Sequence, residues 1–177
     1  MKYLVLTDIH GSSKYLNLAI EKFNNLSCDR ILLLGDILYH GPRNDLPLGY
    51  NPKEVIKVLN GLKDKILSVK GNCDAEVDEM VLEFPLHPTL TINHNGIVLE
   101  LVHGHNLELA EGAGYVLYGH NHVNVQNEKL INIGSLSIPK DNHHTYAVID
   151  ENELTSYDLF TDEVVMKVSL WKWSFLI

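Results

Sequence analysis

Seven side chains that can bind metal ions follow short apolar runs of the sequence, at the points where those runs end. Six are aspartate or histidine and one is asparagine, and they are Asp8, His10, Asp36, Asn72, His103, His120 and His122. In an open α/β sheet, side chains that follow neighbouring strands converge on one crevice at the carboxyl ends of the strands. We therefore expect these residues to meet at a single site.

The ligand atoms of this set are nitrogen and oxygen, without a sulfur-rich cluster. Such a set suits Mn²⁺, Zn²⁺, Fe, Co²⁺ or Ni²⁺ better than Ca²⁺. Two divalent metal ions, with Mn²⁺ as first choice, can be held if one carboxylate bridges them, and we expect Asp36 to be that bridge. Aspartate and asparagine also favour turns, so any one of these residues alone could be a simple turn residue.

The first half of the chain contains the elements that would position these residues. Apolar runs at 3–6, 30–34 and 66–69 predict buried strands. Residues at helical spacing predict two helices between the strands, the first beginning at Ser12 or Ser13 and the second at Pro52. Strands that alternate with helices are typical of parallel βαβ units.

The second half contains short strands and few helical patterns. The expected strands are 90–92, 97–102, 115–118, 123–125, 130–133, 146–149, 154–159 and 164–168, with a hairpin turn at His94–Asn95–Gly96. The predicted fold class is α/β, as a two-sheet α/β/β/α sandwich with mixed parallel and antiparallel strands and with helices outside. At 177 residues, we expect one domain over residues 1–177.

The charge of the chain limits its partners. With 14 basic and 23 acidic residues the formal net charge is −9, which repels a long nucleic-acid backbone. A small phosphorylated substrate remains compatible, because bound divalent ions reverse the field locally. The apolar run Met1–Leu6 is too short for a signal peptide or a membrane span, and Cys28 and Cys73 do not form a disulfide pattern. We expect a cytoplasmic protein without a membrane partner.

Five short motifs occur in the order and rough spacing of the calcineurin-like metallophosphoesterases. They are Asp8–Ile9–His10, Gly35–Asp36, Gly71–Asn72–Cys73–Asp74, His103–Gly104–His105 and Gly119–His120–Asn121–His122. Each motif is weak alone, but the ordered set is specific. The resemblance extends over residues 2–168 and is strongest to the small bacterial phosphodiesterase subgroup.

The resemblance implies a ligand set and a reaction. One metal ion would be held by Asp8, His10, Asp36 and His122, and a second by Asp36, Asn72, His103 and His120. A hydroxide that bridges the two ions would attack the phosphorus of a small phosphodiester in line with the leaving oxygen.

The sequence departs from the family at Cys73, where many members have a histidine that contacts the phosphate or protonates the leaving group. A thiol can donate a proton but is not a cation. His40 and Arg43, in the long loop 37–51, are candidates for the missing function, so the candidate catalytic residues are His40, Cys73 and Arg43. We expect Asp74 to cap a short helix that begins near Ala75.

Three functions are compatible with these residues. The first is a metal-dependent phosphodiesterase, and the second is a phosphomonoesterase or nucleotide pyrophosphatase that uses the same site. The third is a non-catalytic protein-interaction scaffold, since a retromer subunit resembles the same family and fold does not fix function. The apolar end of the chain, 171–177, predicts either packing against its own sheet or contact in a homo-oligomer.

Overall fold

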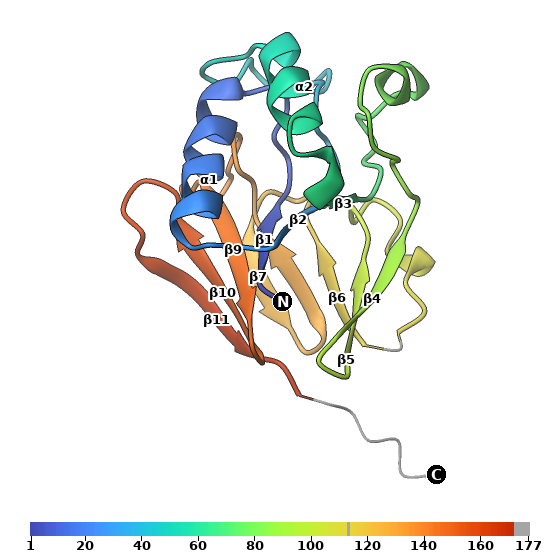
Figure 1. The fold of residues 1–177 in the computed structure, drawn as a ribbon, viewed down its shortest axis with the longest axis vertical. Helices are drawn as coiled ribbons and strands as arrows, with labels where there is room; N and C mark the ends of the chain where they lie inside the picture. The colour runs from blue at the N-terminus through green and yellow to red at the C-terminus, as the bar shows by residue number, and fades with distance from the viewer. Residues whose placement is uncertain (113, 172–177) are drawn as a thin grey trace.

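The computed structural model describes residues 1–112 and 114–171, and two β-sheets form its centre (Figure 1). One sheet has six strands in the order β11-β10-β9-β1-β2-β3: β1 Tyr3–Leu6, β2 Arg30–Leu33, β3 Ile66–Ser68, β9 Thr145–Asp150, β10 Glu153–Asp158 and β11 Val164–Ser169. The other has five in the order β4-β5-β6-β8-β7: β4 Leu90–His94, β5 Ile97–Leu101, β6 Tyr115–Tyr118, β7 Asn124–Asn127 and β8 Leu130–Ile133. The predicted two-sheet sandwich is confirmed.

The strand directions bring several loops to one end of the sandwich. Strands β1, β2 and β3 are parallel to one another, as are β5, β6 and β8 in the second sheet. The remaining neighbours pair antiparallel. They are β1 with β9, the closing meander of β9, β10 and β11, and the β4–β5 and β7–β8 pairs. Every candidate ligand therefore follows a strand that is parallel to its neighbour.

Two α-helices lie side by side on the outer face of the six-stranded sheet (Figure 1). Helix α1 (Ser13–Asn25) is capped by the Ser12 hydroxyl, which accepts a hydrogen bond from the Tyr15 N–H at 3.3 Å. Helix α2 (Pro52–Asn60) begins with proline, whose fixed φ suits the first turn. Both starting points agree with the sequence, and the buried faces of the two helices cover Leu4 and Leu6 of β1.

The alternating side chains of β1 join two cores. Tyr3 and Val5 point away from the helices and pack against the second sheet, where they meet Leu99 and Leu117. The α/β/β/α prediction places an α-helix on the outer face of the second sheet as well, and the structure differs there. In the part of the chain that the structure describes, the short 3-10 helix Leu107–Leu109 lies there in place of an α-helix. Its segment is too short and too rich in glycine for a longer helix.

Two further 3-10 helices, Lys63–Lys65 and Glu76–Met80, lie in loops. No helix among the described residues is long and apolar enough to cross a membrane. The predicted role of the chain end concerns residues 171–177, of which Trp171 is exposed and 172–177 lie outside the described residues.

Candidate metal centre

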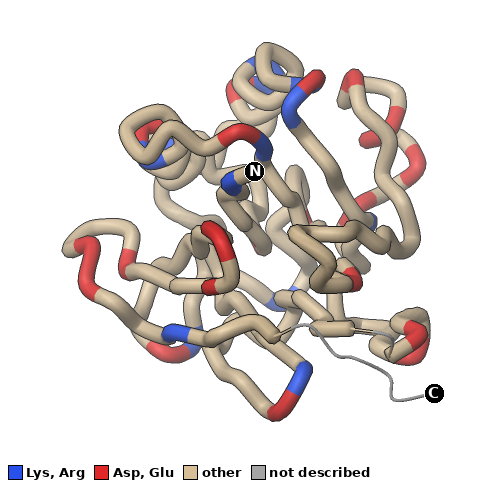
Figure 2. Tube along the Cα trace, turned by 60° about the horizontal axis from the view of Figure 1, so that its bottom comes forward, with Lys and Arg blue, Asp and Glu red and all other residues tan. Residues whose placement is uncertain are grey.

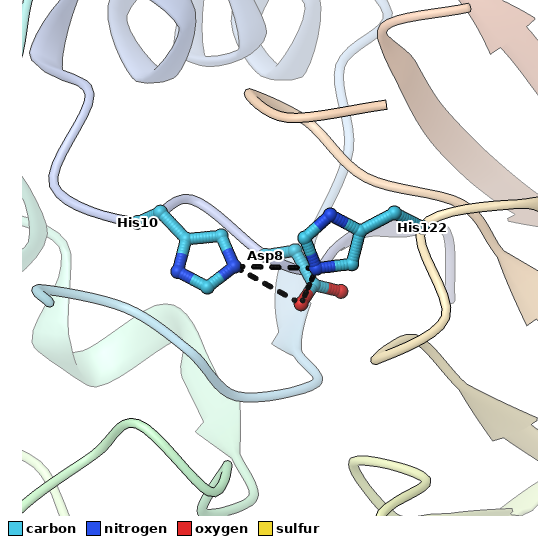
Figure 3. A group of neighbouring side chains, drawn as sticks. All are labelled: Asp8, His10 and His122. Atoms are coloured by element: carbon cyan, nitrogen blue, oxygen red, sulfur yellow. Dashed lines mark hydrogen bonds and ion pairs between the residues drawn. The ribbon is translucent and has the colours of Figure 1, made fainter. Parts of the chain in front are cut away.

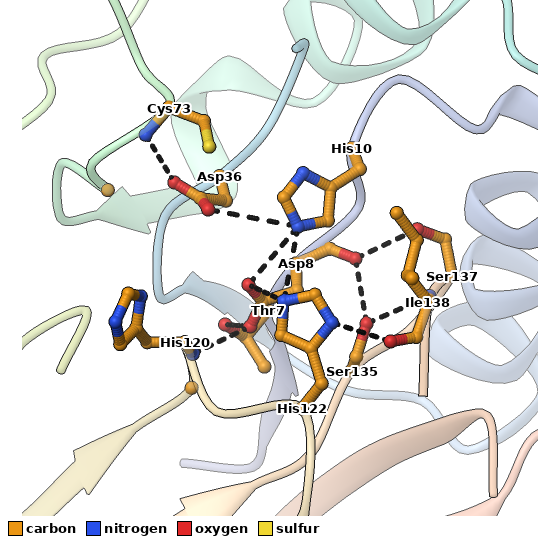
Figure 4. Close-up of polar contacts among 12 residues, drawn as sticks. Thr7, Asp8, His10, Asp36, Cys73, His120, His122, Ser135, Ser137 and Ile138 are labelled. Atoms are coloured by element: carbon orange, nitrogen blue, oxygen red, sulfur yellow. Dashed lines mark hydrogen bonds and ion pairs between the residues drawn. The ribbon is translucent and has the colours of Figure 1, made fainter. Parts of the chain in front are cut away.

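The loops that follow β1 and β2 run beside each other and carry three of the candidate ligands. The backbone N–H of Asp8 donates to the Gly35 carbonyl at 3.1 Å, and that of His10 donates to the Asp36 carbonyl at 2.9 Å. The parallel pairing of the strands thus continues into the loops. The hydroxyls of Ser135 and Ser137 donate to the Asp8 carbonyl at 3.2 and 3.0 Å and fix this turn from the other side (Figure 4).

Asp8, His10 and His122 form one group of converging side chains (Figure 3). Asp8 Oδ1 lies 3.4 Å from His10 Nε2 and 3.2 Å from His122 Nε2, and the two Nε2 atoms are 3.4 Å apart. All three side chains are buried. These distances place two nitrogens and one oxygen around a common point, as three ligands of one ion require.

Asp36, His103 and Asn72 form a second group beside the first. His103 Nε2 lies 3.3 Å from Asp36 Oδ2 and 3.1 Å from Asn72 Oδ1. Asp36 Oδ2 also lies 3.7 Å from His10 Nε2, so this carboxylate stands between the two groups, in the position expected of a bridge. His120 reaches the cluster through its backbone N–H, which donates to Asp8 Oδ2 at 3.0 Å, and its ring centroid is 5.1 Å from that of His103.

Backbone carbonyls fix the orientation of three of the imidazoles. Nδ1 of His10 contacts the Tyr39 carbonyl at 2.8 Å, that of His103 the Leu34 carbonyl at 2.7 Å, and that of His122 the Ile138 carbonyl at 2.5 Å. A carbonyl can only accept, so each Nδ1 carries the proton and each Nε2 turns a lone pair inward when the ring is neutral.

The centre of the cluster is suited to a cation. Asp8 Oδ1 is buried and accepts no hydrogen bond, although it faces two imidazole nitrogens. Burial opposes protonation of His103, but the adjoining Asp36 carboxylate and the charge of Asp8 raise its pKa to about 9. Burial would raise the pKa of Asp8, but the contacts with His10 and His122 hold it well below its usual range. An unpaired buried carboxylate oxygen beside inward lone pairs fits a bound divalent ion.

Five of the seven predicted ligands have a positive φ. Asp8, His10, Asp36, His120 and His122 have φ values between 47° and 67°. This left-handed conformation costs free energy in residues other than glycine and persists only where surrounding contacts enforce it. Here those contacts are the hydrogen bonds between the ligand loops.

Two glycines leave room for the carboxylates. A Cβ at Gly71 would lie 2.1 Å from Asp36 Oδ1, and one at Gly119 would lie 2.4 Å from Asp8 Oδ2. Both distances are far below van der Waals contact, so any side chain at either position would displace a candidate ligand.

Asp74 does not cap the following helix, so that prediction is wrong. The cap position is Ala75, and the Asp74 carboxylate instead accepts three buried backbone N–H groups: Asp36 at 2.8 Å, Ile37 at 2.7 Å and Gly71 at 2.7 Å. It therefore joins the loop after β2 to the loop after β3. The sequence pattern concealed this because an aspartate before a short helix is an ordinary capping signal.

A cleft of about 670 Å³ opens above the cluster. Its lining residues are Asp36, Tyr39, Gly41, Pro42, Arg43, Asn44, Asn72, Cys73, Asp74, Ala75, His120, His122 and Lys140. The predicted residues Cys73 and Arg43 are among them. His40 is not, because its ring packs against those of Tyr39 and Tyr50. The cations of the cleft include Lys140, which the sequence analysis missed.

Cys73 contacts Asp36 through its backbone, whose N–H donates to Asp36 Oδ1 at 2.8 Å. Its sulfur lies within 4.8 Å of ligand atoms of His10 and Asp36 and could reach the same ion. Burial, and then the charge of Asp36, raise the pKa of the thiol to about 12. Without a metal ion the thiol is therefore protonated at neutral pH, whereas thiolate is the form that binds metals.

The comparisons with known proteins agree with this site. Residues 1–154 match the family described as the calcineurin-like phosphoesterase superfamily domain. Phosphodiesterase YfcE of Escherichia coli is 36% identical, over 96% of this chain and 98% of the relative. The solved structure of that phosphoesterase from E. coli superimposes with a TM-score of 0.88 at 35% identity, over 96% of this chain and 100% of the other. Vacuolar protein sorting 29 from Cryptosporidium parvum shares the fold, with a TM-score of 0.62 at 14% identity over 95% and 97% of the two chains.

Proposed function

The chain belongs to the calcineurin-like phosphoesterase superfamily, and we propose that it is a metal-dependent phosphodiesterase that hydrolyses small phosphodiesters. The observation that carries this proposal is the convergence of two carboxylates, three inward-facing imidazoles and one carboxamide beside a cleft of substrate size, which Asp36, Asn72 and His122 line. The E. coli relative is named as a phosphodiesterase, and this supports the same reaction class.

The residues form two sets of ligands, one for each of two divalent ions. Asp8, His10 and His122 would hold one, His103, Asn72 and His120 the other, and Asp36 would be shared. When bound, such ions lower the pKa of water and withdraw charge from phosphoryl oxygens. Mn²⁺ is our first choice for both, and Zn²⁺, Fe, Co²⁺ or Ni²⁺ fit the same nitrogen and oxygen ligands.

The chain's own part is to fix these groups before a substrate arrives. Carbonyls of Tyr39, Leu34 and Ile138 hold the histidine rings, and the Cys73 N–H holds Asp36. The cations Arg43 and Lys140, which line the cleft, would attract an anionic substrate to an otherwise acidic protein. His40 and Cys73 remain predictions as proton donors, although His40 lies outside the cleft lining.

The test uses metal-stripped protein, with an aryl phosphodiester and the matching phosphomonoester, each with and without added Mn²⁺. We expect hydrolysis of the diester that depends on the metal and clearly exceeds that of the monoester. Preference for the monoester would move the protein to the phosphomonoesterases. If neither ester is hydrolysed with any divalent metal, the scaffold function replaces this proposal.

A further inference from the structure

Two cations in the cleft, Arg43 and Lys140, have no acidic partner among the described residues. Most lysines with described contacts are paired with carboxylates, such as Lys22 with Asp162 and Lys70 with Glu79. Within residues 1–112 and 114–171, Arg43 and Lys140 form no ion pair, although acidic residues are distributed over many loops of the surface (Figure 2). In a chain with a net charge of −9, two unpaired cations at one cleft indicate an anion as their partner.

The backbone that carries Lys140 is fixed to the metal centre. The Lys140 N–H donates to the His122 carbonyl at 2.9 Å, and two residues earlier the Ile138 carbonyl accepts from His122 Nδ1. The next residue, Asp141, accepts from the Asn124 N–H at 2.5 Å. The backbone at Lys140 is therefore held next to His122, a candidate ligand.

The loop that carries Arg43 is also hydrogen-bonded to the centre. The Tyr39 carbonyl contacts His10 Nδ1 at 2.8 Å, and the Asn44 side chain donates to the His40 carbonyl at 2.8 Å and closes the turn around Arg43. The two cations thus lie in two segments of the cleft lining, each of which is hydrogen-bonded to a candidate ligand histidine.

The positive charge among the lining residues of the cleft is larger than the single negative charge of a diester requires. Asp36 and Asp74 are the carboxylates among the lining residues, and Asp74 is saturated by three backbone N–H groups. Two divalent ions would already outweigh Asp8 and Asp36, and a diester linkage carries a single negative charge. Arg43 and Lys140 therefore add positive charge to the cleft beyond that of the two ions.

We propose that Arg43 and Lys140 bind a second phosphate group on the substrate, and so select small diesters that carry a terminal phosphate. This inference rests on the proposed phosphodiesterase function. A guanidinium fork and an ammonium are the side chains that best bind phosphate oxygens, and a cleft of about 670 Å³ accommodates a substrate of nucleotide size.

The kinetic test compares two probes that share one leaving group. These are the p-nitrophenyl ester of thymidine 5′-phosphate and the same ester with an added 3′-phosphate, both with Mn²⁺. We expect the wild-type protein to show a kcat/KM about tenfold or more higher for the phosphorylated probe, mainly through KM. Lys140→Ala and Arg43→Ala should each remove most of this preference, and Lys140→Arg should retain it.

Lys53→Ala is the matched control, because it makes the same change in net charge at an exposed position of α2, outside the cleft lining. It should keep the preference. Equal losses for both probes in Lys140→Ala and Arg43→Ala would show that the cations act on the scissile phosphate, and this would overturn the inference. A wild-type protein without preference would also overturn it.

A binding experiment decides the inference without turnover. Calorimetry would compare thymidine 3′,5′-bisphosphate with thymidine 5′-monophosphate on the protein without added metal. We expect the bisphosphate to bind about tenfold more tightly to the wild type and to Lys53→Ala, and the difference to shrink in Lys140→Ala and Arg43→Ala. Equal affinities in all four proteins would overturn the inference. Failure of every diester to be hydrolysed would instead count against the proposed function.

Discussion

The carboxylate of Asp74 accepts a hydrogen bond from the backbone N–H of Asp36 at 2.8 Å and thereby fixes the backbone of the candidate bridging ligand. The same carboxylate accepts the N–H groups of Ile37 and Gly71. Gly71 has no space for a side chain because Asp36 lies against its Cα. The two loops are therefore locked together at the point where the metal centre needs its central carboxylate.

Replacing Asp74 by alanine should destabilise the fold by about 3 kcal/mol, because three buried N–H groups lose their acceptor. Urea denaturation followed by circular dichroism measures this loss. Asp78→Ala is the control, since Asp78 accepts one N–H, that of Ala75, at a partly exposed position and should cost less than about 1 kcal/mol. Equal losses in the two variants would contradict the proposed tie between the loops.

Asp36→Asn should reduce bound metal and diester hydrolysis by at least about 100-fold, since the central carboxylate serves both groups of ligands. The fold should be retained, because the amide oxygen can still accept the Cys73 N–H. Metal content after dialysis and turnover of an aryl diester are the two measurements. Full turnover in this variant would refute Asp36 as the bridge.

The sequence predicted the strands most accurately where an apolar run has clear polar or glycine limits. Strands β1, β6 and β8 begin and end where expected, and the helix starts at Ser12 and Pro52 were also correct. The seven candidate ligands meet at one site because the parallel strands carry them to the same end.

The supporting contacts could not be predicted in the same way. Lys140 reaches the cleft because its N–H pairs with the His122 carbonyl, and the Tyr39 carbonyl orients His10 across 29 positions of the sequence. Such contacts depend on loop conformation, and no periodic pattern records them. His40 illustrates the same limit, since its proximity to Asp36 in sequence does not bring its ring into the cleft.

Added Mn²⁺ should raise the melting temperature of the metal-stripped protein. At a concentration of 100 times Kd, binding of one ion to the folded state contributes about 2.7 kcal/mol. For a chain of this size, that corresponds to about 5–10 °C. Differential scanning calorimetry with Mn²⁺ and with excess chelator makes the comparison, and Asp36→Asn should show little shift. Identical melting temperatures with and without metal would contradict a metal-stabilised centre.

Asp158, which is not a candidate ligand, should make stability depend on pH. Burial would raise the pKa of its carboxyl, but hydrogen bonds from the N–H groups of Thr161 and Phe160 outweigh this and hold the pKa below its usual value of 3.8. Because the folded pKa is depressed, the stabilisation is complete above about pH 4 and is lost as the pH falls through the folded pKa. Between pH 7 and pH 3, the free energy of unfolding should fall less in Asp158→Asn than in the wild type, as measured by denaturation at both pH values. A loss of the same size would assign the acid sensitivity to other carboxyls.

Cys73→Ala should retain the bound metal and slow diester hydrolysis by less than about tenfold. Alanine keeps the backbone N–H that supports Asp36, and a thiol whose pKa is about 12 supplies little acid at neutral pH. A general acid contributes about 100-fold or more, so a loss of that size would assign the proton donor to Cys73. Loss of metal would instead identify its sulfur, which lies near His10 and Asp36, as a ligand. Turnover and metal content measured on the same preparation distinguish the three outcomes.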